Sequence, residues 1–229
     1  MAPRKPAPEA SLPLAKAPAR AIAHLRATDP RMGAIIDHVG PFHLPEKPAD
    51  FFALCSAIMG QSISVKAAKT IVARFEDLAG GRDYATPAII LAEDADYWKE
   101  RLRLSRAKAG ALIGLAQVWE REAYTDAQLR ATADADLIQT LTEVRGIGPW
   151  TVKMFLIFNL RRPDVFPQED LGVVEGLRVL YDLPKRPTAR EALAMAEPWA
   201  PWRTVATWYL WQGLMKSRDE DLNSGGGWW

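Results

Sequence analysis

The spacing of apolar residues along the chain predicts helices rather than strands. Within residues 65–79 the apolar positions recur every three or four residues, as in an amphipathic helix: Val65, Ala68, Ile71, Val72 and Phe75. No stretch alternates between apolar and polar positions for long enough to be a convincing strand, and we find no internal repeat. We therefore expect an all-α fold of about ten helices joined by short Gly/Pro turns.

Capping residues mark where these helices begin and end. Residues 21–38 predict one or two short helices interrupted near Asp29-Pro30, and the helical segment after residue 50 bends around Gly60 to Ser64. Gly80-Gly81 ends that segment. The residues in N-cap positions are Asp50, Thr86 and Ser105, and a further helix starts near Asp134.

The stretch VRGIGPW, residues 144–150, lies between two predicted helices. The first helix ends near Val144, and the second starts at Pro149, whose fixed φ suits a first helical turn. Gly146 and Gly148 can adopt positive φ and carry no Cβ, so the turn is tight and its amides are uncovered. Amide donors at the start of a helix form an anion site, to which a DNA phosphate could bind. On the two glycines alone, a plain helix–helix turn is the simpler interpretation.

Composition limits the function classes further. The 229 residues carry a net charge of +1, which neither requires nor excludes a nucleic-acid partner. Cys55 is the only cysteine, which excludes an intrachain disulfide framework and a four-cysteine iron–sulfur cluster. The longest apolar run, residues 154–160, is too short to span a membrane. We expect an intracellular, cytoplasmic protein with no membrane association.

Both ends of the chain differ in composition from the middle. Residues 1–19 are rich in Ala and Pro and carry several basic side chains, which is typical of a disordered basic tail. Residues 223–229 include three glycines followed by two tryptophans and predict a flexible tail. We place the folded domain at residues 20–222.

Five segments, in order, carry a resemblance to a known family. They are FFALCSAIMGQSISVKAAKTIVARF (51–75), LRLSRAKAGALIGLA (102–116), LTEVRGIGPWTVKMFLIF (141–158), VFPQEDLGVVEGL (165–177) and PWAPWRTVATWYLW (198–211). Together they resemble the helix-hairpin-helix DNA glycosylase superfamily, and within it the 3-methyladenine DNA glycosylase II enzymes of the short form, without an N-terminal β-rich domain. The resemblance implies two helical lobes, roughly 50–155 and 20–45 plus 156–222, with a DNA-binding helix-hairpin-helix and an active-site cleft between them.

The resemblance assigns a catalytic role to Asp170. The family's aspartate follows the hairpin tryptophan by twenty positions, which from Trp150 leads to Asp170 rather than to its neighbour Glu169. Asp170 is also where the N-cap of the next helix belongs. Both interpretations can hold together, since a capped carboxylate is held rigid.

The resemblance also implies a base pocket lined by Trp150 and Trp211, with Met154 at a position that is often aromatic in the family. Trp98 and Trp119, together with Trp208, fit core packing instead. Lyases of the superfamily place a nucleophilic lysine where Trp150 stands, so we expect a monofunctional hydrolase. Lys153, one helical turn further on, is then a solvated or phosphate-facing side chain.

Three further sets of residues complete the expected site. Phosphate contacts come from the amides of Gly146 and Gly148, with Arg145 or Lys153. In the family, main-chain carbonyls of the hairpin hold a monovalent cation, Na⁺ or K⁺, at positions matched by Thr142, Val144 and Ile147. A bulky wedge follows MGQ in the family and fills the gap left by a flipped base. Here the wedge position holds Ser62, which is too small to fill such a gap, so Gln61 and Ile63 are alternatives.

These features predict an enzyme that excises alkylated bases of the 3-methyladenine and 7-methylguanine type from double-stranded DNA as a monomer. Met154 and Ser62 leave open a glycosylase for another damaged or mismatched base. A non-catalytic helix-hairpin-helix DNA-binding module is the alternative from a different class. That module has no use for Asp170 beside an aromatic pocket.

Overall fold

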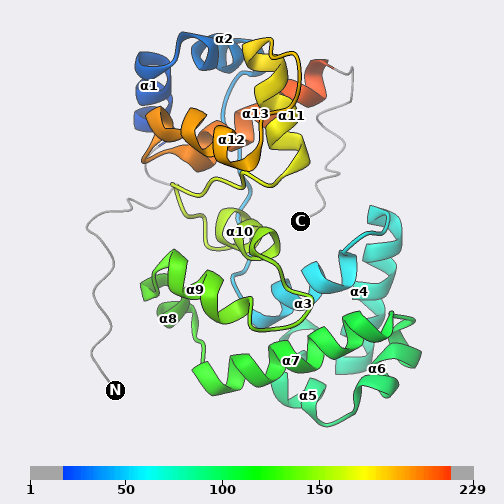
Figure 1. The fold of residues 1–229 in the computed structure, drawn as a ribbon. Helices are drawn as coiled ribbons and strands as arrows, with labels where there is room; N and C mark the ends of the chain where they lie inside the picture. Colours follow the sequence, from blue (N-terminus) through cyan, green and yellow to red (C-terminus); the bar gives the residue numbers. More distant parts are fainter. Residues whose placement is uncertain (1–17, 218–229) are drawn as a thin grey trace. The chain divides into compact units, whose positions relative to one another are not determined.

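A computed structural model describes residues 18–217, and all regular secondary structure in that range is helical (Figure 1). The all-α expectation is therefore confirmed for this part of the chain. The first helix, α1 (Pro18–Thr28), begins two residues inside the expected N-terminal tail. The rest of that tail, and the expected C-terminal tail at 223–229, lie outside the described residues.

The described residues fall into two compact units. One is Lys47–Phe155, and the other combines residues 18–46 with 156–217. Helix α10 (Pro149–Phe158) contributes residues to both. No helix in the range 18–217 is long and apolar enough to cross a membrane.

The first unit is built around α7 (Arg106–Glu122), against which several other helices pack (Figure 1). These include α3 (Phe51–Gly60), α5 (Pro87–Leu91) and α6 (Ala95–Leu102), while α4 (Val65–Ala79) packs on α3. The remaining elements are the 3₁₀ turn η2 (Arg82–Tyr84), α8 (Asp126–Ala131) and α9 (Asp134–Leu141).

Aromatic side chains form the centre of this first unit. Phe52 stacks on Phe75 with ring centroids 5.7 Å apart, and Phe75 meets Trp98 edge-on. The Trp98 indole is 2 % exposed and donates its Nε1–H to the Ile90 carbonyl at 2.9 Å. Trp119 is also buried, at 7 % exposed, against Phe51. The core role predicted for Trp98 and Trp119 is confirmed.

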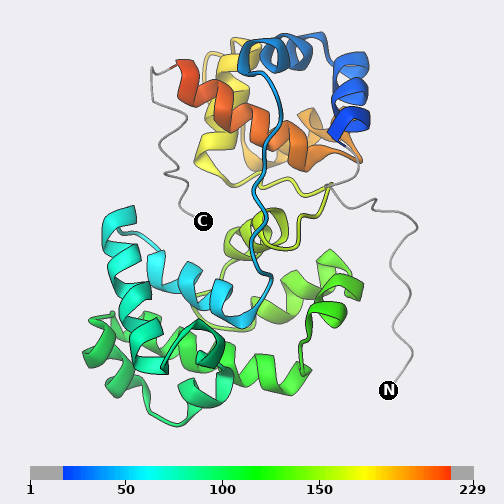
Figure 2. The ribbon, with the colours of Figure 1, turned by 180° about the vertical axis from the view of Figure 1, so that it is seen from behind.

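The second unit packs α13 (Arg203–Ser217) against α2 (Pro30–Val39) and α11 (Leu171–Tyr181), as the view from behind shows (Figure 2). It also contains α1, α12 (Ala189–Met195) and the 3₁₀ turn η3 (Glu197–Trp199). Gly176 lets α11 approach α13 closely: a Cβ there would lie 3.0 Å from the Leu210 Cβ.

Asp29 ties three elements of this unit together. It caps α2, accepting from the amides of Arg31 and Met32 with Oδ1. Its Oδ2 accepts from the Tyr181 hydroxyl of α11 and from the Trp199 indole of η3. Burial alone raises the pKa of Asp29, but these four hydrogen bonds outweigh it and hold the pKa below its ordinary value.

The capping residues read from the sequence match the structure closely. Asp50, Thr86 and Ser105 each accept a hydrogen bond from an amide of the helix that follows. Gly80 ends α4 in the left-handed conformation. The thirteen α-helices between residues 18 and 217 exceed the expected ten, because short helices such as α6 and α8 carry little periodic signal.

Candidate active site

The turn between α9 and α10 is longer than the sequence indicated. Helix α9 ends at Leu141, three residues before the predicted end near Val144. Glu143 and Val144 donate to carbonyls three residues back, Thr140 and Leu141, so the helix tightens before it stops. The Ile147 amide then donates to the Val144 carbonyl at 2.9 Å, which closes the turn.

The two glycines of the hairpin play different roles. Gly146 has φ +103°, and a Cβ there would lie 3.2 Å from the Ala111 Cβ of α7. It therefore needs both the positive φ and the missing side chain. Gly148 does not have positive φ, and nothing lies within 4 Å of where its Cβ would be. A side chain at 148 would meet open space, into which an external group could approach the backbone.

Small and apolar residues pack the hairpin against α7. Val144 and Ile147 are each 4 % exposed, and a Cβ on Gly114 of α7 would lie 3.1 Å from Val144 Cγ1. In the described part of the chain the amides of Gly146 and Gly148 donate to no acceptor. They lie just ahead of the N-terminus of α10, so the turn presents two donors at the positive end of a helix dipole. The Arg145 side chain beside them is exposed.

The loop after MGQ, residues 61–64, is braced from two sides. The Gln61 side-chain amide donates to the Gly146 carbonyl at 3.1 Å and to the Thr151 hydroxyl at 3.4 Å. On the other side, Lys108 Nζ donates to the main-chain carbonyls of Met59 and Gln61 at 2.8 and 2.6 Å. Burial lowers the pKa of Lys108. This brace was not expected from the sequence, which indicated only a bend.

The three wedge candidates differ in the exposure and the contacts of their side chains. The Gln61 side chain is engaged with the hairpin, so it is not extended from the loop. Ser62 is exposed at φ +56°, an uncommon conformation for a residue other than glycine. Ile63 is half-buried. The structure thus favours Ser62 and Ile63 over Gln61 as the residues at the tip of the loop, and which of them enters DNA stays a prediction.

The expected site residues of α10 are less exposed than the sequence indicated. Lys153 is only 9 % exposed, so the interpretation of a solvated side chain is wrong, whereas a phosphate-facing role stays a prediction. The cause is that α10 is buried at every position from Thr151 to Ile157, so no face of the helix in that range is open to solvent. Met154 is 1 % exposed, and Trp150 is half-buried. Their place in a base pocket stays a prediction.

Asp170 and Trp211 meet in the second unit. Asp170 caps α11, its Oδ1 accepting from the Val173 amide at 2.9 Å. The same oxygen accepts from the Trp211 indole Nε1–H, also at 2.9 Å. The N-cap role read from the sequence is confirmed. The indole bond was not expected, because the sequence placed both residues near one pocket without linking them.

Two further residues fix the Trp211 ring. Phe158 stacks on it with centroids 5.7 Å apart and an interplanar angle of 12°. Gly172 leaves the space in which the indole lies: a Cβ there would be 3.0 Å from Trp211 Cδ1 and 3.1 Å from Asp170 Oδ1. Sequence reasoning missed both, and the only signal it offered for Gly172 was an isolated glycine inside a helical pattern. The neighbour Glu169 is exposed.

Trp199, Trp208 and Trp211 pack against different partners. Trp199 is fully buried and bonded to Asp29, as described above. Trp208 is half-buried and meets Phe42 edge-on at 5.0 Å. Only Trp211, among those in α13, contacts the Asp170 carboxylate.

The donor groups needed for a metal cluster are not gathered in residues 18–217. No three His, Cys, Asp or Glu side chains in that range lie together as ligands would. Cys55 is buried, and burial raises the pKa of its thiol.

Comparison with known proteins identifies the family. Residues 55–201 match the model of the HhH-GPD superfamily of base excision DNA repair proteins. The chain belongs to this superfamily. DNA-3-methyladenine glycosylase 1 of Schizosaccharomyces pombe is 35 % identical over 196 residues, covering 82 % of this chain and 84 % of the relative. DNA-3-methyladenine glycosylase of Saccharomyces cerevisiae is 39 % identical over 157 residues, covering 62 % and 51 %.

Solved structures of the superfamily have the same fold. The S. pombe 3-methyladenine DNA glycosylase Mag1 in complex with abasic DNA superposes with a TM-score of 0.73 at 32 % identity, covering 84 % of this chain and 95 % of Mag1. A DNA-3-methyladenine glycosidase of Bacillus halodurans gives 0.78 at 30 %, covering 87 % and 91 %. An 8-oxoguanine glycosylase/lyase of Clostridium acetobutylicum shares the fold alone, at 15 % identity with a TM-score of 0.68 and coverage of 90 % and 72 %.

Proposed function

We propose that the chain is a base-excision-repair DNA glycosylase that hydrolyses the N-glycosidic bond of flipped-out alkylated purines, such as 3-methyladenine and 7-methylguanine, and leaves an abasic site. The observation that carries this proposal is the Asp170 carboxylate, held by the Val173 amide and the Trp211 indole. The printed names of the relatives, and the abasic DNA bound by Mag1, support the substrate class.

The fixed carboxylate suits the chemistry of this bond. Cleavage builds positive charge on the deoxyribose, and a carboxylate near C1′ opposes that charge. At about 4 Å and an effective dielectric constant near 20, the attraction is roughly 4 kcal/mol, which corresponds to about a thousandfold in rate. That is too little for a normal base but suits an alkylated purine, which is already cationic and leaves more readily.

An aromatic pocket would favour such a cationic base. The faces of tryptophan rings attract cations, whereas a neutral base gains less from them. The resemblance to the family assigns Trp150, Met154 and Trp211 to this pocket. The base has to leave the stack to reach any of these side chains.

The same residues argue for a monofunctional enzyme. A lyase needs an amine that attacks the sugar, and the superfamily position for it holds Trp150 here. Lys153 is buried at 9 % exposed and lies one turn away, so it does not replace that amine. The reaction we infer is hydrolysis without a Schiff base.

The partner we infer is double-stranded DNA, bound by a monomer. The amides of Gly146 and Gly148 would bind a phosphate, with Arg145 adding charge. The carbonyls of Thr142, Val144 and Ile147 are uncharged oxygen ligands, and backbone carbonyls can coordinate a monovalent cation such as Na⁺ or K⁺. The Val144 carbonyl already accepts from the Ile147 amide, and its second lone pair would complete the set.

The first test is single-turnover release of base from a duplex that contains one 3-methyladenine or 1,N6-ethenoadenine. Asp170→Asn should slow release about a thousandfold. Its DNA affinity and stability should be unchanged, since Asn caps a helix as well as Asp. Glu169→Gln removes the neighbouring, exposed carboxylate and serves as the matched control, which should cleave at the wild-type rate.

Two results would contradict the proposal. If wild-type protein binds these duplexes without releasing base, the chain acts on another lesion or only binds DNA. If Asp170→Asn cleaves as fast as wild type, the carboxylate is a helix cap and nothing more.

A further inference from the structure

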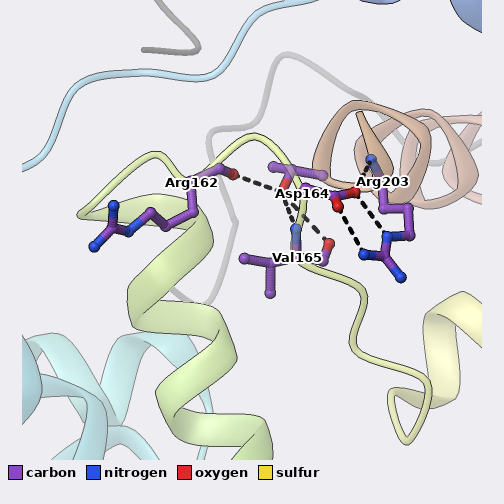
Figure 3. A network of polar contacts seen from close by, with 5 residues as sticks. Arg162, Asp164, Val165 and Arg203 are labelled. Atoms are coloured by element: carbon purple, nitrogen blue, oxygen red, sulfur yellow. Dashed lines mark hydrogen bonds and ion pairs between the residues drawn. The ribbon is translucent and has the colours of Figure 1, made fainter. Parts of the chain in front are cut away.

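A cluster of hydrogen bonds joins residues 162–165, which precede Asp170 in the chain, to the start of α13 (Figure 3). Asp164 accepts two hydrogen bonds from the Arg203 guanidinium: Nε to Oδ1 at 2.7 Å and Nη2 to Oδ2 at 2.6 Å. The Arg203 main-chain amide also donates to Asp164 Oδ1, at 3.2 Å. The carboxylate thus lies at the N-terminus of α13, where the helix dipole favours negative charge. The hydrogen bonds that Arg203 donates to the Asp164 carboxylate raise the pKa of Arg203.

Thr204 adds a second set of bonds between the same two segments. Its hydroxyl is fully buried, donates to the Arg162 carbonyl at 2.6 Å and accepts from the Val165 amide at 2.9 Å. Its main-chain amide donates to the Pro163 carbonyl at 3.0 Å. We call Asp164, Arg203 and Thr204 the loop clamp. It fixes main-chain groups of residues 162–165 against the first two residues of α13.

The two segments joined by the loop clamp are also the two that carry the Asp170–Trp211 bond. The loop runs five residues from Val165 to Asp170, and α13 runs seven residues from Thr204 to Trp211, a rise of about 10 Å. Between these ends, Phe166 is buried edge-on against Trp199, and Asp170 closes a turn with the Pro167 carbonyl. The loop is therefore held against α13 at both ends.

Because the loop is held against α13 at both ends, the distance between Asp170 and Trp211 depends on the loop clamp. Helix α13 is rigid over two turns, so a shift of the loop at Asp164 moves Asp170 relative to the indole. The bidentate, charge-assisted hydrogen bonds between Arg203 and Asp164 resist such a shift more strongly than a single neutral hydrogen bond would. No sequence motif linked Asp164 to Arg203, because 39 residues separate them.

We infer that Asp164 and Arg203 are positioning residues for excision, which hold the Asp170 carboxylate on the Trp211 indole through the loop clamp. This inference rests on the proposed function for its effect on rate. Its structural part, the dependence of the Asp170–Trp211 bond on the loop clamp, can be measured without activity.

The test compares Arg203→Lys and Asp164→Asn with wild type. Lysine keeps the positive charge but cannot form the bidentate hydrogen bonds of the guanidinium. Asparagine keeps the shape of aspartate but loses its negative charge. Each variant should slow single-turnover excision about tenfold, while the Kd for the same duplex stays within about twofold. Arg26→Lys is the matched control, because Arg26 pairs with Asp37 at 2.6 Å in the same unit and touches neither segment of the loop clamp. Its rate should be that of wild type.

A double-mutant cycle separates positioning from a loss of stability. Trp211→Phe removes the indole donor, so in its background Arg203→Lys should slow excision by less than twofold, whereas their effects on the free energy of unfolding should add. Independent, multiplicative effects on rate would overturn the inference. So would rates that fall only in proportion to lost folded protein.

The indole proton gives a readout that does not need a substrate. The Trp211 indole N–H resonance, assigned with Trp211→Phe, should shift in Arg203→Lys and stay in place in Arg26→Lys. An unmoved resonance overturns the inference. If the resonance moves but wild-type protein excises no alkylated base, the proposed function fails and the dependence on the loop clamp stands.

Discussion

The hairpin at residues 142–149 and the loop at residues 161–170 both join two helices, yet they are held by different parts of the chain. The hairpin is closed by main-chain bonds and by a glycine at φ +103° that fits against α7, with one side-chain bond from Gln61 to the Gly146 carbonyl. The loop is held by side chains, namely the loop clamp at one end and the Trp211 indole at the other. The hairpin presents amide donors, whereas the loop presents a carboxylate.

This difference fits the two tasks we propose. A phosphate is the same at every nucleotide, so amides in a fixed turn can bind it without reading sequence. Stabilising charge on one sugar needs a carboxylate held to a fraction of an ångström, and side-chain bonds supply that restraint. The comparison predicts that substitutions at glycines of the hairpin act through the backbone, and that substitutions around the loop act through Trp211 and Asp170.

Of the substitutions that test this comparison, Gly146→Ala should have the largest effect, and that effect is on stability. Alanine at φ +103° strains the backbone, and its Cβ would crowd Ala111 at 3.2 Å. We expect a loss of about 1–3 kcal/mol in the free energy of unfolding, measured with urea. Gly40→Ala is the matched control for strain alone, since Gly40 has φ +95° with nothing within 4 Å of a Cβ. A loss no larger than that of the control would mean that α7 does not constrain the turn.

Gly172→Ala should affect the rate rather than the fold. The added methyl group would lie 3.0 Å from Trp211 Cδ1 and displace the indole from Asp170. We expect single-turnover excision to slow about tenfold, or about 1.4 kcal/mol in the barrier. Gly110→Ala on α7, which meets nothing within 4 Å, should leave the rate unchanged. If both variants cleave like wild type, the Trp211–Asp170 contact does not matter for excision.

The sequence predicted the hairpin better than the loop, and the reason is the range of the interactions. Caps and turns such as Asp50, Gly80 and Pro149 depend on neighbours within four residues, so local spacing reveals them. The Asp170 cap was visible for the same reason. Asp164–Arg203 and Asp170–Trp211 join positions about 40 residues apart, which single-sequence spacing cannot link. Lys153 was misplaced because a lysine in an apolar helix predicts solvation, whereas burial is decided by what packs around α10.

Gly148→Ala and Arg145→Ala should separate two kinds of phosphate contact. A Cβ at 148 meets nothing in the protein, so it would obstruct only an approaching phosphate. We expect DNA affinity to fall about fivefold in each variant, with no change in the urea midpoint. The slope of log K against log salt should stay the same for Gly148→Ala and become shallower by about 0.9 for Arg145→Ala, since only the arginine releases a counterion. Unchanged affinity in Gly148→Ala would remove the hairpin amides from the interface.

The smallest effect we expect is an acid-dependent one on α11, the helix that Asp170 caps. Hydrogen bonds from Arg178 and Arg186 lower the pKa of Glu175 from the ordinary 4.5 to about 2. Because the folded-state pKa is the lower one, the stabilisation is present above pH 4.5 and is lost as the pH falls towards 2. Urea unfolding of wild type and Glu175→Gln should therefore differ at pH 7 and converge as the pH falls below 4.5. If the difference in the free energy of unfolding between the two proteins stays constant with pH, the two arginines hold Glu175 by packing rather than by charge. Helix α11 would then resemble the hairpin, where charge has no part in holding the turn.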